Sequence, residues 1–148
     1  DTVYAKHQDL IAVLSNQVFR ISQRVGDGAK TKLVNNLLAS INLSGAAEVM
    51  GLAEKMGLDL STTLNVIEHS SGQSWIGSDR MRRAIANDYA PRAHTTLLAK
   101  DSKLAVQSAS HLSYPTPLGQ VAMATFARAV EHGYADLDDA SLFKLMQK

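Results

Sequence analysis

The chain has 148 residues, of which 45% are hydrophobic and 20% charged, a size and balance typical of one globular domain that exclude a disordered chain. The net charge of +1 lacks the basic excess of a nucleic-acid binder, and no apolar stretch is long enough to predict a membrane span, so we expect neither partner. The absence of cysteine excludes disulfides, thiolate catalysis and cysteine-based zinc sites, and it fits a cytoplasmic location.

The first 25 residues differ from the rest in the secondary structure that their sequence predicts. Residues 3–14 predict a helix with leucine and isoleucine on one face, and residues 18–21 predict a short strand. A lone strand is marginal, so its natural partners are strands of a sheet outside this chain. The chain also begins at Asp1 instead of Met, and we therefore expect a trimmed or excised polypeptide.

One long helix should form the centre of the domain. The glycines at 26 and 28 predict a turn and a helix entry, and an apolar-rich segment follows from residue 29 to about residue 56. Apolar residues occur on more than one of its sides, so we expect it to be buried. Gly57 is the expected C-terminal cap.

Shorter helices are expected after this one. Asp59 or Ser61 would cap the first of them, and Asp138 or Asp139 would cap the last. Polar or proline-containing breaks separate the others, which cover about residues 75–87, 95–109 and 118–131. The predicted fold class is all-α, a helical bundle around one long central helix, preceded by a helix and a strand left over from an α/β domain.

A lysine and two asparagines near the start of the long helix are the main candidates for chemistry. Lys32 and Asn36 are four residues apart and share a helix face, with Asn35 beside them. A cation in the first turns opposes the positive end of the helix dipole, which suits a lysine that must give and take a proton. An amide one turn on can hold a substrate hydroxyl or carboxylate.

An ordinary structural role is the alternative for these residues. Most helical lysines reach the solvent, so Lys32 would extend to the surface while Asn36 satisfies backbone groups. Two adjacent amides in an otherwise apolar helix are costly to bury without partners. We therefore interpret Lys32, Asn35 and Asn36 as part of a polar pocket.

Other kinds of site have little support. The arginines at 80, 82 and 83 are interpreted as solvated surface in preference to a phosphate-binding patch. The five histidines show none of the spacings typical of metal sites, so we expect no metal. No serine nucleophile elbow or phosphate loop is present in the sequence.

The motif around Lys32 resembles the helix-opening motif of the β-hydroxyacid dehydrogenases, which include 3-hydroxyisobutyrate, tartronate-semialdehyde and threonate dehydrogenases. Their pattern is a glycine turn, three residues, Lys, three residues and Asn. This chain matches it at Gly26, Gly28, Lys32 and Asn36, although Gln23 replaces a glycine that is often found three residues earlier.

The resemblance continues in the same order to the end of the chain. A small-residue helix centre, a Ser-Gly-x-Ser-Trp segment, a second lysine motif and the last two helix entries are similar to those of the family. They lie at residues 46–53, 70–75, 98–101, 114–118 and 133–139.

The resemblance implies roles for individual residues. Lys32 would be the general acid/base at the carbon that carries the hydroxyl, and Asn36, together with Asn35, would bind the substrate. Lys100 would approach the nicotinamide end of the cofactor. Asp101 would orient Lys100 or cap locally, without a catalytic role.

Three residues of the serine-rich segment would border the same pocket. Ser71 and Gly72 are predicted to bind substrate, with a helix-capping loop as the alternative for the serines. For Trp75 we favour packing in the core or an interface over a place in the pocket.

The resemblance also implies a missing domain. The glycine pair at 26 and 28 does not complete a dinucleotide fingerprint, because Thr31 stands where the third glycine belongs. Residues 1–25 would be the tail of a Rossmann-type domain that binds most of the NAD or NADP, and residues 26–148 an all-helical catalytic and dimerisation domain. The expected partners are a hydroxy acid, that N-terminal domain and a second copy, and we expect the isolated chain to be inactive.

A different class of function stays open. Small-residue helices such as residues 44–47 suit close helix packing equally well, so the chain can also be a non-catalytic self-association module derived from the same family. The sequence indicates neither which hydroxy acid is used nor the choice between NAD and NADP.

Overall fold

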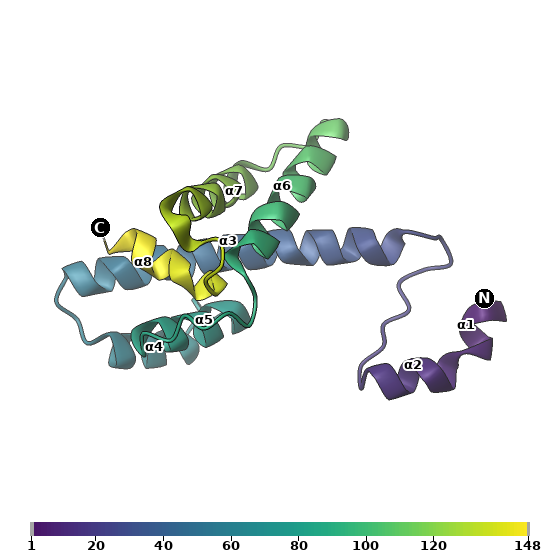
Figure 1. Cartoon of the computed structure of the whole chain (residues 1–148), viewed down its shortest axis with the longest axis horizontal. Coiled ribbons are helices and arrows are strands. Elements are labelled where there is room, and N and C mark those ends of the chain that lie inside the picture. Colours follow the sequence, from purple (N-terminus) through teal and green to yellow (C-terminus); the bar gives the residue numbers. More distant parts are fainter. Residues whose placement is uncertain (1, 148) are drawn as a thin grey trace. The chain divides into compact units, whose positions relative to one another are not determined.

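A computed structural model describes residues 2–147 of the chain (Figure 1). The chain divides into two units, and the boundary falls between Lys32 and Leu33, within the longest helix.

The first unit contains two short helices and the start of a third. α1 (Thr2–Lys6) and α2 (Gln8–Leu14) replace the single helix predicted over residues 3–14. The break is at His7, whose backbone angles, φ −117° and ψ 14°, are not helical. No strand is present at residues 18–21, so that prediction was wrong, and within the first unit this segment has no strand to pair with.

The entry to α3 (Asp27–Lys55) is held by side chains around Asp27. Its carboxylate accepts hydrogen bonds from Ser22 Oγ at 2.8 Å, Arg24 Nε at 3.0 Å and Lys30 Nζ at 3.2 Å. These bonds, that of Ser22 foremost, lower the pKa of Asp27. Gly26 precedes it with φ +94°, a left-handed conformation that favours glycine, and the predicted turn and helix entry are confirmed.

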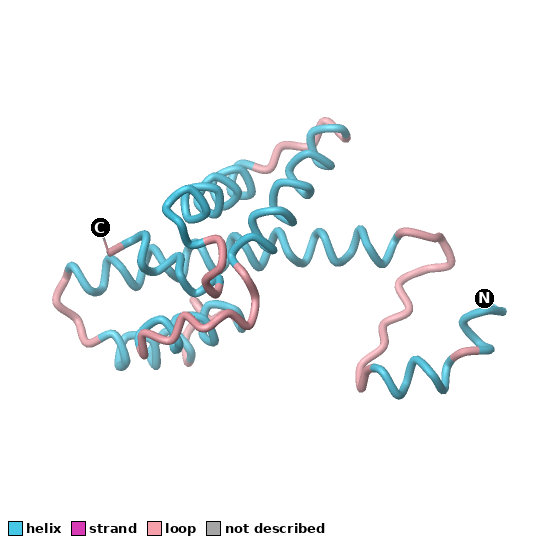
Figure 2. The backbone as a smooth tube through the Cα atoms, in the orientation of Figure 1, coloured by secondary structure: helices cyan, strands magenta, loops and turns pink. Residues whose placement is uncertain are grey.

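The second unit is a bundle of helices around the remainder of α3. Its elements are α4 (Leu60–Glu68), α5 (Trp75–Ile85), α6 (Thr95–His111), α7 (Pro117–Ala129), the π-helical turn η1 (Val130–Tyr134), the 3₁₀ turn η2 (Asp139–Ser141) and α8 (Leu142–Met146). α4 lies beside α5, and α6 lies beside α7 (Figure 1). The all-α prediction is confirmed, because the described part of the chain is drawn as helices and loops without a strand (Figure 2). Among residues 2–147 the one β-type pairing is an isolated bridge between His94 and Asp138.

Side chains of known capping types begin several of these helices. Asp59 Oδ1 accepts from the backbone N–H of Thr62 at 2.7 Å, and Ser74 Oγ accepts from that of Gly77 at 3.1 Å. Such caps satisfy backbone donors that the first helical turn leaves unpaired. Gly57, with φ +73°, ends α3 as predicted.

The core of the second unit contains residues from almost every helix. α3 contributes Leu43, Ala47 and Met50, whose spacing of four and three residues places them on one helix face. They belong to the same cluster as Met81 of α5 and Phe126 of α7. Burial of a side chain of this size stabilises the fold by about 1.5–3 kcal/mol. The expected burial of α3 is therefore confirmed for this face alone, because Val34, Leu38 and Leu52 on its other sides are more than half exposed.

Glycine permits a close approach between α3 and α8. A Cβ atom on Gly51 would lie 2.9 Å from the Cβ of Met146 and 3.3 Å from its carbonyl oxygen. The second neighbour is backbone, so it cannot rotate away. A Cβ on Gly45 of the same helix would meet nothing within 4 Å.

The two glycines are therefore expected to respond oppositely to alanine. Gly51→Ala should lower the free energy of unfolding by about 1–3 kcal/mol, because α8 must shift. Gly45→Ala should raise it by up to about 1 kcal/mol, since alanine favours the helix. Urea unfolding followed by circular dichroism measures both, and equal shifts in one direction would refute the close packing of α8 on Gly51.

Candidate functional site

A buried carboxylate connects α3 to α6 in the second unit. Asp101 of α6 is 5% exposed, and its Oδ2 accepts a hydrogen bond of 2.6 Å from Nδ2 of the half-buried Asn36. Its Oδ1 lies 3.3 Å from Nζ of the neighbouring Lys100. A buried carboxylate is stable only when such donors compensate its charge, so Asp101 and Asn36 hold each other in fixed positions.

The neighbours of Asn36 complete this small network. Asn35 Nδ2 donates to Asn36 Oδ1 at 3.3 Å, and Ser40 Oγ donates to the carbonyl oxygen of Asn36 at 2.8 Å. The Lys100 side chain is 61% exposed, so its ammonium can reach a bound molecule. The prediction that Asp101 orients Lys100 agrees with this geometry, but the bond from Asp101 to Asn36 was not predicted.

Lys32 lies in α3, one turn before Asn36, and is exposed in the described chain. Asn35 is exposed as well. The acid/base role of Lys32 and the substrate contacts of Asn35 and Asn36 stay predictions.

Ser71 and Gly72 belong to a different hollow. They line a cavity of about 460 Å³ that is walled by α3, α4 and α5 and that Asn36, Asn35 and Lys100 do not line. Asn42, which does line it, is six residues after Asn36 and therefore about 240° further around α3. The structure thus does not bring Ser71 and Gly72 together with the Asn36–Asp101 pair, and their role in substrate binding stays a prediction.

The comparison with known proteins identifies the family. The family model described as the NAD-binding domain of NADP-dependent 3-hydroxyisobutyrate dehydrogenase matches residues 26–146. The chain belongs to this family. The predicted nicotinamide cofactor and the predicted relationship are thereby confirmed at the level of the family.

Curated relatives of this chain are dehydrogenases of hydroxy acids. The chain is 32% identical to L-threonate dehydrogenase of Cupriavidus necator, over 96% of this chain and 48% of that protein. It is 31% identical to mitochondrial 3-hydroxyisobutyrate dehydrogenase of Homo sapiens, over 98% and 45%. The chain therefore spans about half the length of the curated relatives that it matches.

A solved structure shares the fold closely. The crystal structure of 3-hydroxyisobutyrate dehydrogenase from Salmonella typhimurium superposes with a TM-score of 0.91 at 32% identity, covering 96% of this chain and 50% of that one.

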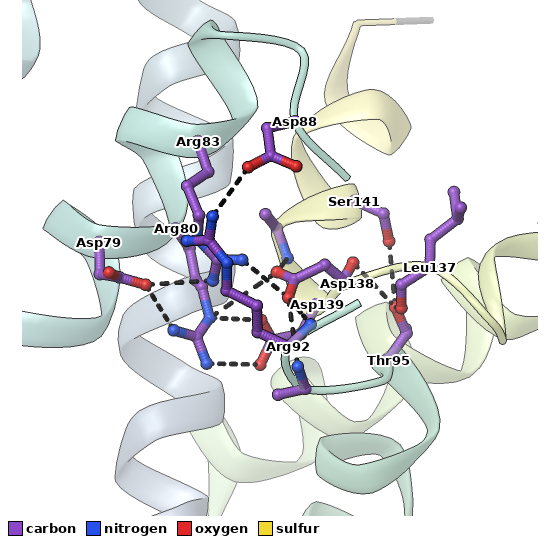
Figure 3. A network of polar contacts seen from close by, with 12 residues as sticks. Asp79, Arg80, Arg83, Asp88, Arg92, Thr95, Leu137, Asp138, Asp139 and Ser141 are labelled. Carbon is purple, nitrogen blue, oxygen red and sulfur yellow. Dashed lines mark hydrogen bonds and ion pairs between the residues drawn. The ribbon is translucent and has the colours of Figure 1, made fainter. Parts of the chain in front are cut away.

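In this family member, two arginines of α5 form a buried ion network with the segment before α8 (Figure 3). Arg80 Nε lies 2.5 Å from Asp139 Oδ1, and Arg83 Nη1 lies 2.8 Å from Asp138 Oδ2. Arg83 is 7% exposed. The interpretation of this arginine cluster as solvated surface was wrong for Arg80 and Arg83, because the countercharges come from a segment more than fifty residues away. It holds for Arg82, which is 69% exposed and pairs with Glu68.

Asp138 is the most heavily bonded residue of the network. Its carboxylate accepts from the backbone N–H groups of Arg92, Ala93 and Ala140 and forms an ion pair with Arg83. Burial alone would raise the pKa of Asp138, but these donors outweigh it and hold the pKa far below its usual range. The neighbouring Asp139 behaves oppositely, because burial raises its pKa to about 6 despite the contact with Arg80.

Trp75 does not pack in the core. Its side chain is 73% exposed in the described chain, and the Arg80 guanidinium lies 5.9 Å from the ring centroid. The preference for core packing was therefore wrong, whereas packing in an interface stays a prediction.

Residues 2–147 contain no cluster of three or more histidine, aspartate or glutamate side chains placed to hold a metal. None of the helices in that range combines the length and the apolar character needed to cross a bilayer.

Proposed function

We propose that the chain is the helical C-terminal domain of an NAD(P)-dependent dehydrogenase that acts on a short 3-hydroxy acid or sugar acid. The observation that carries this proposal is the network in which buried Asp101 binds both Asn36 and Lys100. It brings together one amide predicted to hold substrate and one cation predicted to face the cofactor. The named activities of the relatives, L-threonate and 3-hydroxyisobutyrate dehydrogenase, support the substrate class.

In this proposal, Lys32 is the general acid/base for the hydroxyl of the substrate. It takes the hydroxyl proton during oxidation and returns it during reduction. Asn36, with Asn35 beside it, positions the substrate by hydrogen bonds. The nicotinamide ring accepts or gives the hydride when the cofactor is bound.

Lys100 fits a contact with the cofactor. Its exposed ammonium is anchored on one side by Asp101 at 3.3 Å and offers three N–H donors. Carboxamide and phosphate oxygens of a nicotinamide dinucleotide are acceptors that such a donor prefers. Most of the cofactor would be bound by a Rossmann-type domain in the other half of the polypeptide.

The first unit is consistent with a connection to another domain. Apolar side chains at Val13, Leu14 and Phe19 are more than three-quarters exposed in the described chain. Exposed apolar side chains that gather on one segment are typical of an interaction surface. We propose that residues 1–25 are the tail of that N-terminal domain.

A substrate panel on the native full-length polypeptide tests the function. Its intact mass should be near twice the 16.0 kDa of this chain. With NAD or NADP, L-threonate or 3-hydroxyisobutyrate should produce reduced nicotinamide, seen by its absorbance, and the isolated chain should produce none. A native mass near 16 kDa together with no turnover of any hydroxy acid would contradict the proposal.

A self-association module is the second candidate. The exposed apolar side chains of Leu38 on α3 and of Leu118 and Val121 on α7 favour it. Both candidates predict oligomers in solution, so sedimentation alone does not separate them, whereas turnover does.

A further inference from the structure

The contact between Asp101 and Asn36 fixes more than the distance between two helices. The 2.6 Å bond from Asn36 Nδ2 to Asp101 Oδ2 is short and involves a carboxylate that is almost completely buried. Bonds of this kind, with an ionised acceptor, are stronger than those between neutral groups. Asn36 is therefore strongly restrained by α6.

The chemistry of the carboxylate determines how the Asn36 amide is turned. An ionised carboxylate accepts hydrogen bonds and donates none, so only the NH₂ end of the amide can face Asp101. The carbonyl oxygen, Oδ1, consequently lies at the other corner of the amide group. There it accepts a long bond of 3.3 Å from Asn35 Nδ2, and a carbonyl oxygen has a second lone pair for another donor.

We propose that Asp101 is a positioning residue that turns the Asn36 amide so that Oδ1 is presented as the acceptor for a substrate hydroxyl. The inference rests on the proposed function. It adds which atom of Asn36 contacts the substrate hydroxyl and which residue sets the orientation of the Asn36 amide. Asn36 thus binds an O–H donor of the substrate. A substrate carboxylate at the same place would face the Oδ1 acceptor and form no hydrogen bond with it. The substrate carboxylate is bound elsewhere.

The inference predicts a specific defect in an Asp101→Asn variant. An asparagine at 101 can offer its own NH₂ group, so the Asn36 amide is free to reverse and Oδ1 turns away. In the full-length protein, kcat/KM for 3-hydroxyisobutyrate should fall roughly 10- to 100-fold, because the reacting hydroxyl is misplaced. Asp136→Asn, which removes the same charge from an exposed position, should leave kcat/KM unchanged.

A double-mutant cycle separates positioning from other effects of Asp101. In an Asn36→Ala background, Asp101→Asn should change kcat/KM by less than about threefold, since the amide that it positions is gone. A full 10- to 100-fold loss in that background would overturn the inference. Wild-type protein should also bind 3-hydroxyisobutyrate more tightly than isobutyrate in calorimetry, and Asp101→Asn should abolish this preference.

A second readout does not depend on activity. In ¹⁵N-labelled full-length protein, the side-chain NH₂ of Asn36, assigned by its loss in Asn36→Ala, should exchange slowly with solvent and should lose this protection in Asp101→Asn. Protection that persists without the carboxylate would overturn the inference even in an active dehydrogenase. The remaining outcome is protection that depends on Asp101 in a protein that oxidises no hydroxy acid. That result would support the orientation of Asn36 by Asp101 and would refute the proposed function.

Discussion

A Lys32→Ala variant of the full-length protein is expected to lose about 10²–10⁴-fold in kcat/KM while keeping its fold. That range is typical of removing a general acid/base from an active site. Lys32 is exposed in the described chain, and substitutions at exposed positions usually change stability by less than about 0.5 kcal/mol. Steady-state kinetics with a hydroxy acid, next to a thermal melt of the same sample, measure both quantities.

Two further variants decide what the lysine contributes. Lys32→Arg keeps the positive charge but cannot release a proton near neutral pH, so it should be as inactive as Lys32→Ala. Lys30→Ala, at an exposed lysine two residues earlier whose partner is Asp27, should keep full activity. If Lys32→Arg retained wild-type kcat, Lys32 would be a binding charge and the acid/base assignment would fail.

Asp138→Asn is expected to lower the free energy of unfolding by about 3–5 kcal/mol. Its carboxylate is fully buried and lies 2.8 Å from Arg83, which is itself buried. Removing Asp138 leaves the buried Arg83 with only the more exposed Asp79 as a countercharge, and breaking a buried pair has a cost of this size. Urea unfolding measures the change, and Asp136→Asn, an exposed aspartate two residues earlier, should change it by less than about 0.5 kcal/mol. A loss below about 1 kcal/mol in Asp138→Asn would show that the pair does not stabilise the fold.

The two buried carboxylates should also give opposite dependences on pH. The pKa of Asp138 is depressed in the fold, so its contribution is present above the ordinary value of 3.8 and is lost as the pH falls below it. The pKa of Asp139 is raised to about 6, so its contribution is complete below 3.8 and is lost as the pH rises through 6. The free energy of unfolding should therefore be measured between pH 3 and 7. Asp138→Asn should abolish its decrease at the acid end of this range, and Asp139→Asn should abolish its change between about pH 4 and 6.

Helices that carry their own signals could be predicted from the sequence. Gly57 and Asp59 mark the end of one helix and the start of the next, and both act as expected. The buried face of α3 could not be predicted from spacing, because apolar residues occur on more than one side of this helix and only the face with Leu43 and Met50 is buried. The strand at residues 18–21 was wrong because a strand depends on a neighbour that local sequence does not supply.

Contacts between distant segments could not be predicted in this way. Nothing near Arg80 or Arg83 shows that two aspartates will meet them, so a cluster of cations was interpreted as surface. The same limit applies to the site: Asn36 and Lys100 were identified by motif, but the bond from Asp101 to Asn36 joins residues 65 positions apart.

The distance along the chain between Arg80 and Asp139, 59 residues, bears on how the protein is made. At about 5–20 residues per second, a ribosome needs roughly 3–12 seconds to synthesise that interval. During this time Asp79, on the same helix, is the countercharge available to the two arginines of α5. We therefore expect their full burial, and the final packing of α5, to follow the synthesis of Asp138 and Asp139.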